Sequence, residues 1–258
     1  LGNPRRWPAA LYSLIQWRRL TRFERRVCGQ ADAVLAVSDA DARALTRLLP
    51  GLEPLVIPNG VDLARYWPCH VFDHPGLPDS LPLQHPAIVF TGKMDYRPNV
   101  DAMLWFYNCV WARVRAELRH ARLYVVGKEP HRRLASLLRD SSVTVTGYVD
   151  DILPYFGGAD VYIAPLRIGG GTRLKVLEAM SAGLPLVATT LGVEGVGLTS
   201  GQHALLADTP EGFGSAVVDL LRDPERARAL GLAARQFVVE RYDWGRTVAR
   251  LHLLYTSI

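Results

Sequence analysis

The chain has 258 residues, of which 49% are hydrophobic and 21% charged, a composition that excludes disordered, collagen-like and coiled-coil proteins. No apolar run reaches the ~18 residues that a membrane span needs, and three scattered cysteines fit a reducing cytoplasm better than a disulfide framework. The net charge of +5 equals the excess within residues 1–50, where nine arginines stand against four acidic residues, so the positive charge is concentrated at the front of the chain.

Residues 7–27 place apolar side chains at helical spacing with arginines between them, a pattern that predicts a basic amphipathic helix. Two interpretations remain open for it. The helix could make a peripheral contact with acidic lipid at the inner face of a membrane, or it could pack on a further domain with its arginines solvated. After it, the apolar run 31–38 predicts a short strand, and Ser38 with Asp41 three residues later predicts the start of a helix over 39–48.

A proline-rich stretch follows a second short strand, which begins near residue 55 and stops at a Pro-Asn-Gly turn. Residues 67–86 contain five prolines and little periodicity, so we expect an ordered connector there. Four potential metal ligands fall within it, namely Cys69, His70, His74 and His85. Because single ligands scattered over a loop are usually incidental, we predict no metal site.

From residue 87 onward, short apolar runs alternate with helical patterns. Most of the runs end in Gly, Pro or Thr and suit strands buried on both faces, at 87–92, 122–127, 143–147, 160–165, 185–189 and 203–207. Helices are expected at 99–119, 130–139, 151–157, 172–182, 211–221, 224–241 and 244–255. Thr209 and Asp223 each precede a proline in a helix-start pattern. The alternation predicts an α/β fold with a Rossmann-like, doubly wound parallel sheet.

Glycines and cations follow several of these strands. Ligands of an open parallel sheet bind beyond the carboxyl ends of the strands, where we expect Gly92, Lys93, Arg97, Gly147, Tyr148, Val149, Gly169, Gly170, Gly171, Thr172, Arg173 and Lys175. Three consecutive glycines let the backbone approach a ligand closely, and a helix N-terminus carries a partial positive charge. The triplet at 169–171, with Arg173 and Lys175 beside it, therefore predicts a cradle for a diphosphate.

Glu178 lies inside the helix that comes after the triplet, too far from its start to cap it. Its carboxylate could accept paired hydrogen bonds from the vicinal hydroxyls of a sugar. The alternative is an ordinary ion pair with Lys175 at i, i+3.

Motifs of other nucleotide-binding and hydrolytic folds are absent. No strand is followed by G-x-G-x-x-G, no P-loop is present, and no G-x-S-x-G sequence marks a hydrolase nucleophile. We expect no nucleic-acid partner, because the excess charge is confined to one helix and no alternation of aromatic and basic residues runs through the sheet.

The run PLRIGGGTRLKVLEAMSAGLPLVATTLGV at 165–193 resembles the donor-binding signature of the GT-B retaining glycosyltransferases of family 4, with its "glycosyl transferases group 1" domain. Further segments resemble the family in the same order, at 31–38, 57–62 and 241–244. The GGG-x-R-x-K pattern is similar to a subgroup tied to exopolysaccharide synthesis. The resemblance covers roughly residues 30–256 and implies the C-terminal, donor-binding half of such an enzyme.

The resemblance also implies roles for individual residues. Glu178 matches the second glutamate of the family's E-x7-E motif, which binds the ribose of a nucleotide-sugar, whereas Gly170 stands where the first glutamate would be. Lys93 and Arg97 resemble the two cations that neutralise the diphosphate, with a spacing one residue shorter than usual. The residues 147–149 fall where the backbone reads the base.

The reaction that the resemblance implies is metal-independent transfer with retention of a hexose, from a UDP- or GDP-linked donor to a glycan or lipid-linked acceptor, without a further cofactor. Lys93, Arg97 and the glycine-loop amides would stabilise the charge on the departing diphosphate. Two alternatives remain: a non-catalytic nucleotide-binding or scaffolding module, motivated by Gly170, and a GT-B epimerase or phosphorylase relative, for which Lys175 is the candidate pyridoxal phosphate lysine.

The first methionine is Met94, which predicts that the chain is part of a longer one. The resemblance implies that the acceptor pocket belongs mainly to the N-terminal domain, of which we expect only the tail here, so the chain should not transfer sugar alone. We expect four parts. They are the tail of an N-terminal acceptor domain at 1–60, an interdomain linker at 61–86, the donor-binding domain at 87–241 and a crossover helix at 242–258.

Overall fold

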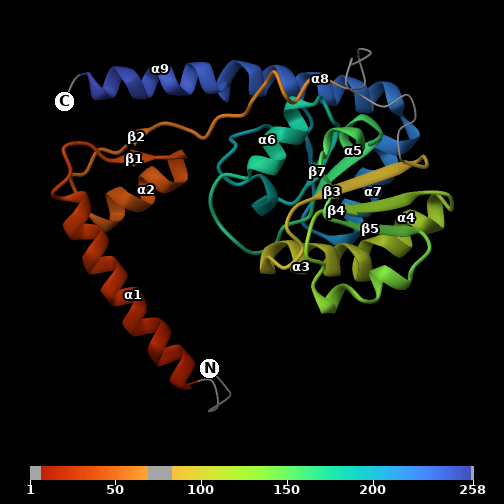
Figure 1. Cartoon of the computed structure of the whole chain (residues 1–258), viewed down its shortest axis with the longest axis horizontal. Coiled ribbons are helices and arrows are strands. Elements are labelled where there is room, and N and C mark those ends of the chain that lie inside the picture. Colours follow the sequence, from red (N-terminus) through yellow and green to blue (C-terminus); the bar gives the residue numbers. More distant parts are fainter. Residues whose placement is uncertain (1–6, 69–82, 257–258) are drawn as a thin grey trace. The chain divides into compact units, whose positions relative to one another are not determined.

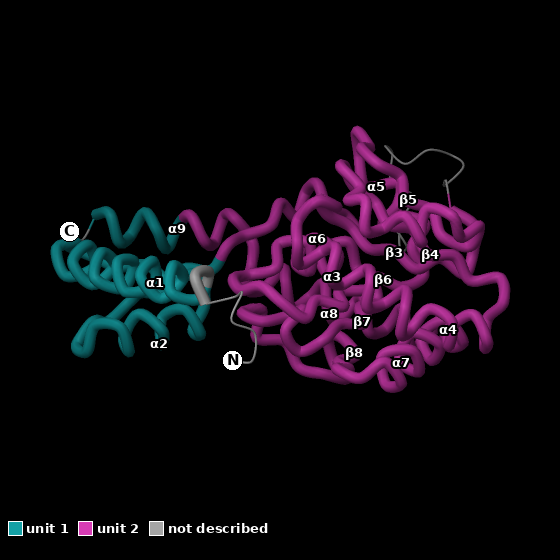
Figure 2. Tube along the Cα trace, turned by 90° about the horizontal axis from the view of Figure 1, so that it is seen from below, with its two compact units in different colours: residues 1–58, 249–258 teal, residues 59–248 magenta. Residues whose placement is uncertain are grey.

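The computed structural model describes residues 7–68 and 83–256, so Cys69, His70 and His74 lie outside the described part. The chain divides into two compact units, residues 1–58 with 249–258, and residues 59–248 (Figure 2). Among the described residues, no helix is both long and apolar enough to cross a membrane.

The smaller unit confirms the helix and strand predictions for the front of the chain. Its elements are α1 (Trp7–Cys28), β1 (Leu35–Ala36), α2 (Asp39–Leu48) and β2 (Leu55–Val56). The two short strands pair in parallel. Ser38 caps α2 as predicted, because its side chain accepts a hydrogen bond from the amide of Asp41 at 3.1 Å. The large apolar residues along the described part of α1 are exposed, for example Leu11, Trp17 and Phe23.

The larger unit is built on a six-stranded parallel sheet with the order β5-β4-β3-β6-β7-β8. The strands are β3 (Ala87–Thr91), β4 (Arg122–Val126), β5 (Val143–Gly147), β6 (Val161–Ala164), β7 (Leu186–Ala188) and β8 (Leu205–Leu206). All six lie within or almost within the predicted runs. The helices are α3 (Arg97–Trp105), α4 (Ala112–Glu117), α5 (Leu153–Gly157), α6 (Leu174–Ser181), α7 (Pro210–Arg222), α8 (Pro224–Arg241) and α9 (Trp244–Tyr255), whose last turns belong to the smaller unit.

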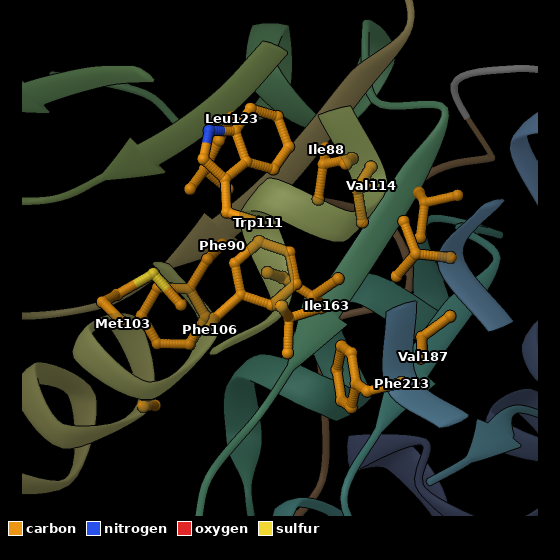
Figure 3. Close-up of a cluster of buried hydrophobic side chains, with 14 of the residues drawn as sticks. Ile88, Phe90, Met103, Phe106, Trp111, Val114, Leu123, Ile163, Val187 and Phe213 are labelled. Carbon is orange, nitrogen blue, oxygen red and sulfur yellow. The ribbon is translucent and has the colours of Figure 1, made fainter. Parts of the chain in front are cut away.

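Helices cover both faces of the sheet, as the sequence predicts (Figure 1). Alternate residues of β3 face opposite sides, so that Ile88 and Phe90 pack with α3, α4 and α7, whereas Ala87 and Val89 pack with α5, α6 and α8. The first of these cores is rich in aromatic rings, and Phe106, Trp111 and Phe213 meet aliphatic side chains of the sheet there (Figure 3). The resulting buried scaffold holds the strand ends in fixed positions.

Two helix predictions are wrong in detail. The stretch 130–139 forms two short 3₁₀ turns, Arg132–Leu134 and Leu137–Arg139, each of which buries one leucine in the core. The i, i+3 spacing of the two leucines suits an α-helix as well, so tertiary packing decides between the two forms. The predicted helix over 99–119 is interrupted by a π-helical segment, Phe106–Trp111. The predicted starts of α7 and α8 are confirmed, since Thr209 and Asp223 each accept a hydrogen bond from an amide of the first turn.

Candidate functional site

The glycine-rich loops predicted after two strands lie at the place where the sheet reverses its winding. β3 pairs with β4 on one side and with β6 on the other, so successive strands are added outward in both directions from the β3–β6 pair. In doubly wound sheets, ligands bind in the crevice beyond the carboxyl ends of the strands at this switch point. The loop after β3 begins at Gly92, and the loop after β6 contains the triplet 169–171. The topology therefore brings together two segments that the sequence separates by about 80 residues.

Close backbone packing at this edge depends on two glycines. A Cβ at Gly127 would lie 1.8 Å from the carbonyl oxygen of Gly92, and a Cβ at Gly92 would lie 2.7 Å from Nζ of Lys175. Both residues also have positive φ, +144° and +148°. Any side chain here would push apart the loops that surround the site.

Among the described residues, Arg173 is the one with buried side-chain nitrogens that lack a hydrogen-bond partner. It immediately precedes α6 and is only 8% exposed. Its Nη1 donates to the carbonyl oxygen of Gly170 at 3.2 Å, but its Nε and Nη2 are buried without a hydrogen-bond partner in the described structure. Buried guanidinium donors almost always have acceptors, and leaving them unpaired costs roughly several kcal/mol. An anionic ligand at the glycine triplet would supply these acceptors.

The glycine triplet itself is open to a ligand. Gly170 and Gly171 are exposed, and a Cβ on either would meet no atom within 4 Å. Gly169 and Gly171 have φ values of +106° and +82°, which only glycine adopts readily. The triplet thus leaves room for a ligand beside the start of α6.

Lys175 connects three elements of the site. Its ammonium donates to the carbonyl oxygen of Thr91 at 2.8 Å and to Oδ1 of Asn99 at 2.7 Å, and it lies 4.3 Å from the centre of the Phe90 ring. Two of its three N–H donors are therefore used within the protein. Asn99 also donates through Nδ2 to the carbonyl oxygen of Lys93 at 2.9 Å, which fixes the loop after β3.

The buried ammonium of Lys175 makes stability depend on pH. Burial, with a smaller contribution from the Arg173 guanidinium, lowers the pKa of Lys175 to about 7. The unfolded chain then binds this proton more tightly than the folded chain between pH 7 and the unfolded pKa of ~10.4, so the free energy of unfolding should rise with pH in that window. From pH 7 to 9 we expect the native chain to gain about 2 kcal/mol relative to Lys175→Met in urea unfolding. Parallel pH dependence of the two proteins would contradict this account.

Glu178 lies on the same helix, partly buried, and contacts a residue that the sequence does not single out. Its Oε1 accepts a hydrogen bond from the hydroxyl of Tyr66 at 3.0 Å. The alternative ion pair with Lys175 is not among the ion pairs of the described residues, because the ammonium is engaged elsewhere. Burial raises the pKa of Glu178, and the hydrogen bond from Tyr66 and the charge of Lys175 partly offset that rise.

The two cations predicted to meet the diphosphate are exposed at the loop after β3. Lys93 Nζ lies 3.1 Å from carboxylate oxygens of both Asp95 and Glu129. Hydrogen bonds to Glu129 and then to Asp95 raise the pKa of Lys93. Arg97 is the first residue of α3 and is exposed. Lys93 therefore starts from a solvated cluster with two carboxylates, which a diphosphate would have to displace.

The residues predicted to read the base stand at the carboxyl end of β5, which is an outermost strand of the sheet. Gly147 ends β5, which is separated from β3 by β4, and has a φ of +72°. Tyr148 is 71% exposed and Val149 partly buried. The structure thus places 147–149 at the edge of the sheet rather than beside the glycine triplet.

Two residues of the site are not predicted by the sequence. Tyr66 is 112 positions from Glu178, and no local pattern predicts their contact. Asn99 reads in the sequence only as the start of a helix, and no local pattern predicts the hydrogen bonds that its buried side chain makes with Lys93 and Lys175. Both residues depend on tertiary packing rather than on spacing along the chain.

Comparison with known proteins relates the chain to glycosyltransferases. Phosphatidyl-myo-inositol mannosyltransferase of Mycolicibacterium smegmatis is 29% identical over 230 residues, which cover 87% of this chain and 57% of that protein. The chain spans 48%, 57% and 63% of the lengths of the first three curated relatives it matches.

Solved structures show the same fold at low identity. Sucrose-phosphate synthase from Thermosynechococcus elongatus has a TM-score of 0.71 at 22% identity, covering 92% of this chain and 61% of that chain. HepE of Anabaena, in complex with UDP and glucose, has a TM-score of 0.68 at 16% identity, covering 92% and 67%. These likenesses support the GT-B assignment of the fold.

Family models agree with the resemblance seen in the sequence. "Glycosyltransferase Family 4" matches residues 3–65, and "Glycosyl transferases group 1" matches residues 85–223, which is more than half of the chain and contains the loops after β3 and β6. The chain therefore belongs to the glycosyl transferases group 1 family.

Proposed function

We propose that this chain forms the donor-binding part of a glycosyltransferase that uses a UDP- or GDP-linked sugar. One observation carries the proposal: Arg173 has two buried, unpaired donors beside an exposed glycine triplet at the switch point of the sheet. A diphosphate has the charge and the oxygen geometry to satisfy them. Glu178, somewhat more than one turn further along α6, would then accept hydrogen bonds from the ribose hydroxyls.

The relatives support the choice of ligand. A mannosyltransferase of Mycolicibacterium smegmatis that is 29% identical to this chain is described as GDP-mannose-dependent, and the HepE structure contains UDP. On this basis we propose a nucleotide-sugar donor, transfer of a hexose, and a glycan or lipid-linked acceptor, with a role in exopolysaccharide synthesis. The acceptor groups would come from outside residues 59–248.

Within this proposal, the reaction needs charge stabilisation rather than a protein nucleophile. Breaking the anomeric bond leaves negative charge on the diphosphate, and preorganised donors that meet this charge lower the barrier. Lys93, Arg97, Arg173 and the amides of the triplet would meet it without a metal, with retention at the anomeric carbon. Gly170 offers no carboxylate to the transferred sugar, so its orientation would depend on backbone amides.

Lys93 provides a test of the diphosphate end of the site. Replacing it with alanine should weaken UDP or GDP about tenfold while leaving the affinity of the corresponding nucleoside unchanged, since only the diphosphate reaches its charge. Isothermal titration calorimetry with both ligands measures the difference. Lys128→Ala, in the next loop, is the matched control. Equal losses for nucleotide and nucleoside would remove Lys93 from the diphosphate site.

A second candidate function is a non-catalytic nucleotide-binding module, which the absence of a carboxylate at Gly170 favours. Donor-dependent product from the intact protein would exclude it, whereas nucleotide binding without product over a broad acceptor panel would support it. The phosphorylase alternative is disfavoured, because Lys175 is held by Thr91 and Asn99. Absence of pyridoxal absorbance in the purified protein would exclude it.

Contact of α1 with a membrane stays a prediction. Its exposed apolar residues, interspersed with arginines, fit the surface of an acidic bilayer at the cytoplasmic face. The same exposure fits packing on a further domain.

A further inference from the structure

Tyr66 reaches the candidate site from a segment that precedes the sheet. The segment 59–68 belongs to the same compact unit as the sheet, and it is tied to the unit where Val61 donates its amide to the carbonyl oxygen of Tyr242 at 2.7 Å. Tyr66 is 8% exposed, and its hydroxyl donates to Oε1 of Glu178 at 3.0 Å. No other hydrogen bond to the Glu178 carboxylate occurs among the described residues.

Tyr66 is held in place through its backbone carbonyl and through its ring. Its carbonyl oxygen accepts hydrogen bonds from Oγ of Ser181 at 3.2 Å and from Nη1 of Arg235 at 2.8 Å. Its ring packs 6.1 Å from the ring of Phe156, centre to centre. Because a tyrosine side chain has only two χ angles, an anchored backbone and a packed ring leave the hydroxyl little freedom. The hydrogen bond therefore constrains Glu178 rather than Tyr66.

We propose that Tyr66 is a positioning residue for Glu178: its hydroxyl occupies one carboxylate oxygen and holds the other toward the ribose of a bound nucleotide. This inference rests on the proposed function, in which Glu178 binds the ribose. A carboxylate with one oxygen fixed needs no reorientation when the ligand arrives, so less entropy is lost on binding. Removing the hydroxyl would leave a partly buried carboxylate without its one protein donor.

Charged and titratable groups around Glu178 set the sign of the pH effect. Lys175 faces it from α6, Tyr66 and Arg65 from the segment 59–68, and the buried Tyr162 from β6. Asp151, before α5, pairs with Arg65 at 3.5 Å. Burial raises the pKa of Glu178, whereas the hydrogen bond from Tyr66 lowers it. Loss of that hydrogen bond should raise the pKa further, so binding by the ionised carboxylate should fail at a higher pH.

Calorimetric titration of the whole chain between pH 5 and 8 tests the inference, with whichever of UDP and GDP binds more tightly. We expect Tyr66→Phe, which keeps the ring, to bind about fivefold more weakly at neutral pH. The midpoint of its affinity loss on acidification should lie about half a pH unit or more above that of the native chain. Glu178→Gln supplies the titration of the other groups in this range, the phosphate and Lys175. Tyr107→Phe, which removes a similar hydrogen bond to Asp140 away from the site, should follow the native profile.

Each contrary result has a distinct meaning. A Tyr66→Phe profile that superimposes on the native one, while Glu178→Gln still weakens binding, overturns the inference and leaves the proposed function standing. A loss that is the same at every pH also overturns it, because it assigns Tyr66 a packing role only. Absence of binding by the native chain overturns the proposed function, and the inference with it.

Discussion

Replacing Arg173 with methionine should weaken nucleotide binding more than ~100-fold and leave the folded chain as stable as before, or more stable. Two of its guanidinium nitrogens, Nε and Nη2, are buried without partners, so the native chain bears a desolvation cost that the hydrogen bond from Nη1 to Gly170 offsets only in part. Replacing a buried ion pair by apolar residues is often neutral or stabilising by about 1 to 4 kcal/mol, and we expect the same direction for a buried guanidinium with unpaired nitrogens. The lost contacts to a diphosphate should cost about 3 kcal/mol, from two hydrogen bonds to charged groups, which is a factor of more than 100 in affinity.

Thermal unfolding with and without UDP or GDP separates the two effects in one experiment. Arg173→Met should keep the melting temperature of the free protein, or raise it, and lose the increase that the nucleotide produces in the native chain. Arg167→Met is the control, since Arg167 lies in the same loop but is exposed and paired with Asp101 at 2.9 Å. A destabilised Arg173→Met that binds nucleotide normally would show that the guanidinium serves the fold alone.

Replacing Glu178 with alanine should weaken nucleotide binding by about 1 to 3 kcal/mol, as expected for the loss of charge-assisted hydrogen bonds. The effect should be specific to the ribose. The native chain should prefer UDP over 2′,3′-dideoxy-UDP, or GDP over its dideoxy analogue, and Glu178→Ala should bind both equally. Calorimetry with the four combinations gives the coupling between the carboxylate and the hydroxyls.

A matched variant controls for the general effect of removing a negative charge. Glu225→Ala removes an exposed carboxylate in the first turn of α8 and should leave both affinities unchanged. If Glu178→Ala keeps the native preference for the ribose hydroxyls, the carboxylate does not contact the sugar. The structural role that would then remain for Glu178 is its hydrogen bond with Tyr66.

The sequence predicts the sheet well, because the patterns that mark strands and helix starts lie within a few consecutive residues. Each of the six strands is a short apolar run that ends near a turn residue, and the helix starts at Ser38, Thr209 and Asp223 are set by a side chain within three residues of the amide it accepts from. The position of the site depends in turn on the sheet. The switch point between β3 and β6 brings Gly92 and the glycine triplet to one edge, as a doubly wound sheet requires.

The wrong or missing predictions concern tertiary contacts, which join residues far apart in the sequence. Lys175 does not pair with Glu178 one turn away, because Thr91 and Asn99 offer it two acceptors from distant elements. The contact of Tyr66 with Glu178 has no local signal for the same reason. The 3₁₀ turns at 132–139 share their leucine spacing with an α-helix, and only packing under the sheet decides between them.

A crystal structure of the chain with UDP or GDP tests the central claim most directly. We predict diphosphate oxygens within hydrogen-bond distance of Nε or Nη2 of Arg173 and of the amides at 170–172, with the ribose hydroxyls on Glu178. A nucleotide bound away from the β3–β6 switch point, with the guanidinium of Arg173 still unpaired, would contradict it.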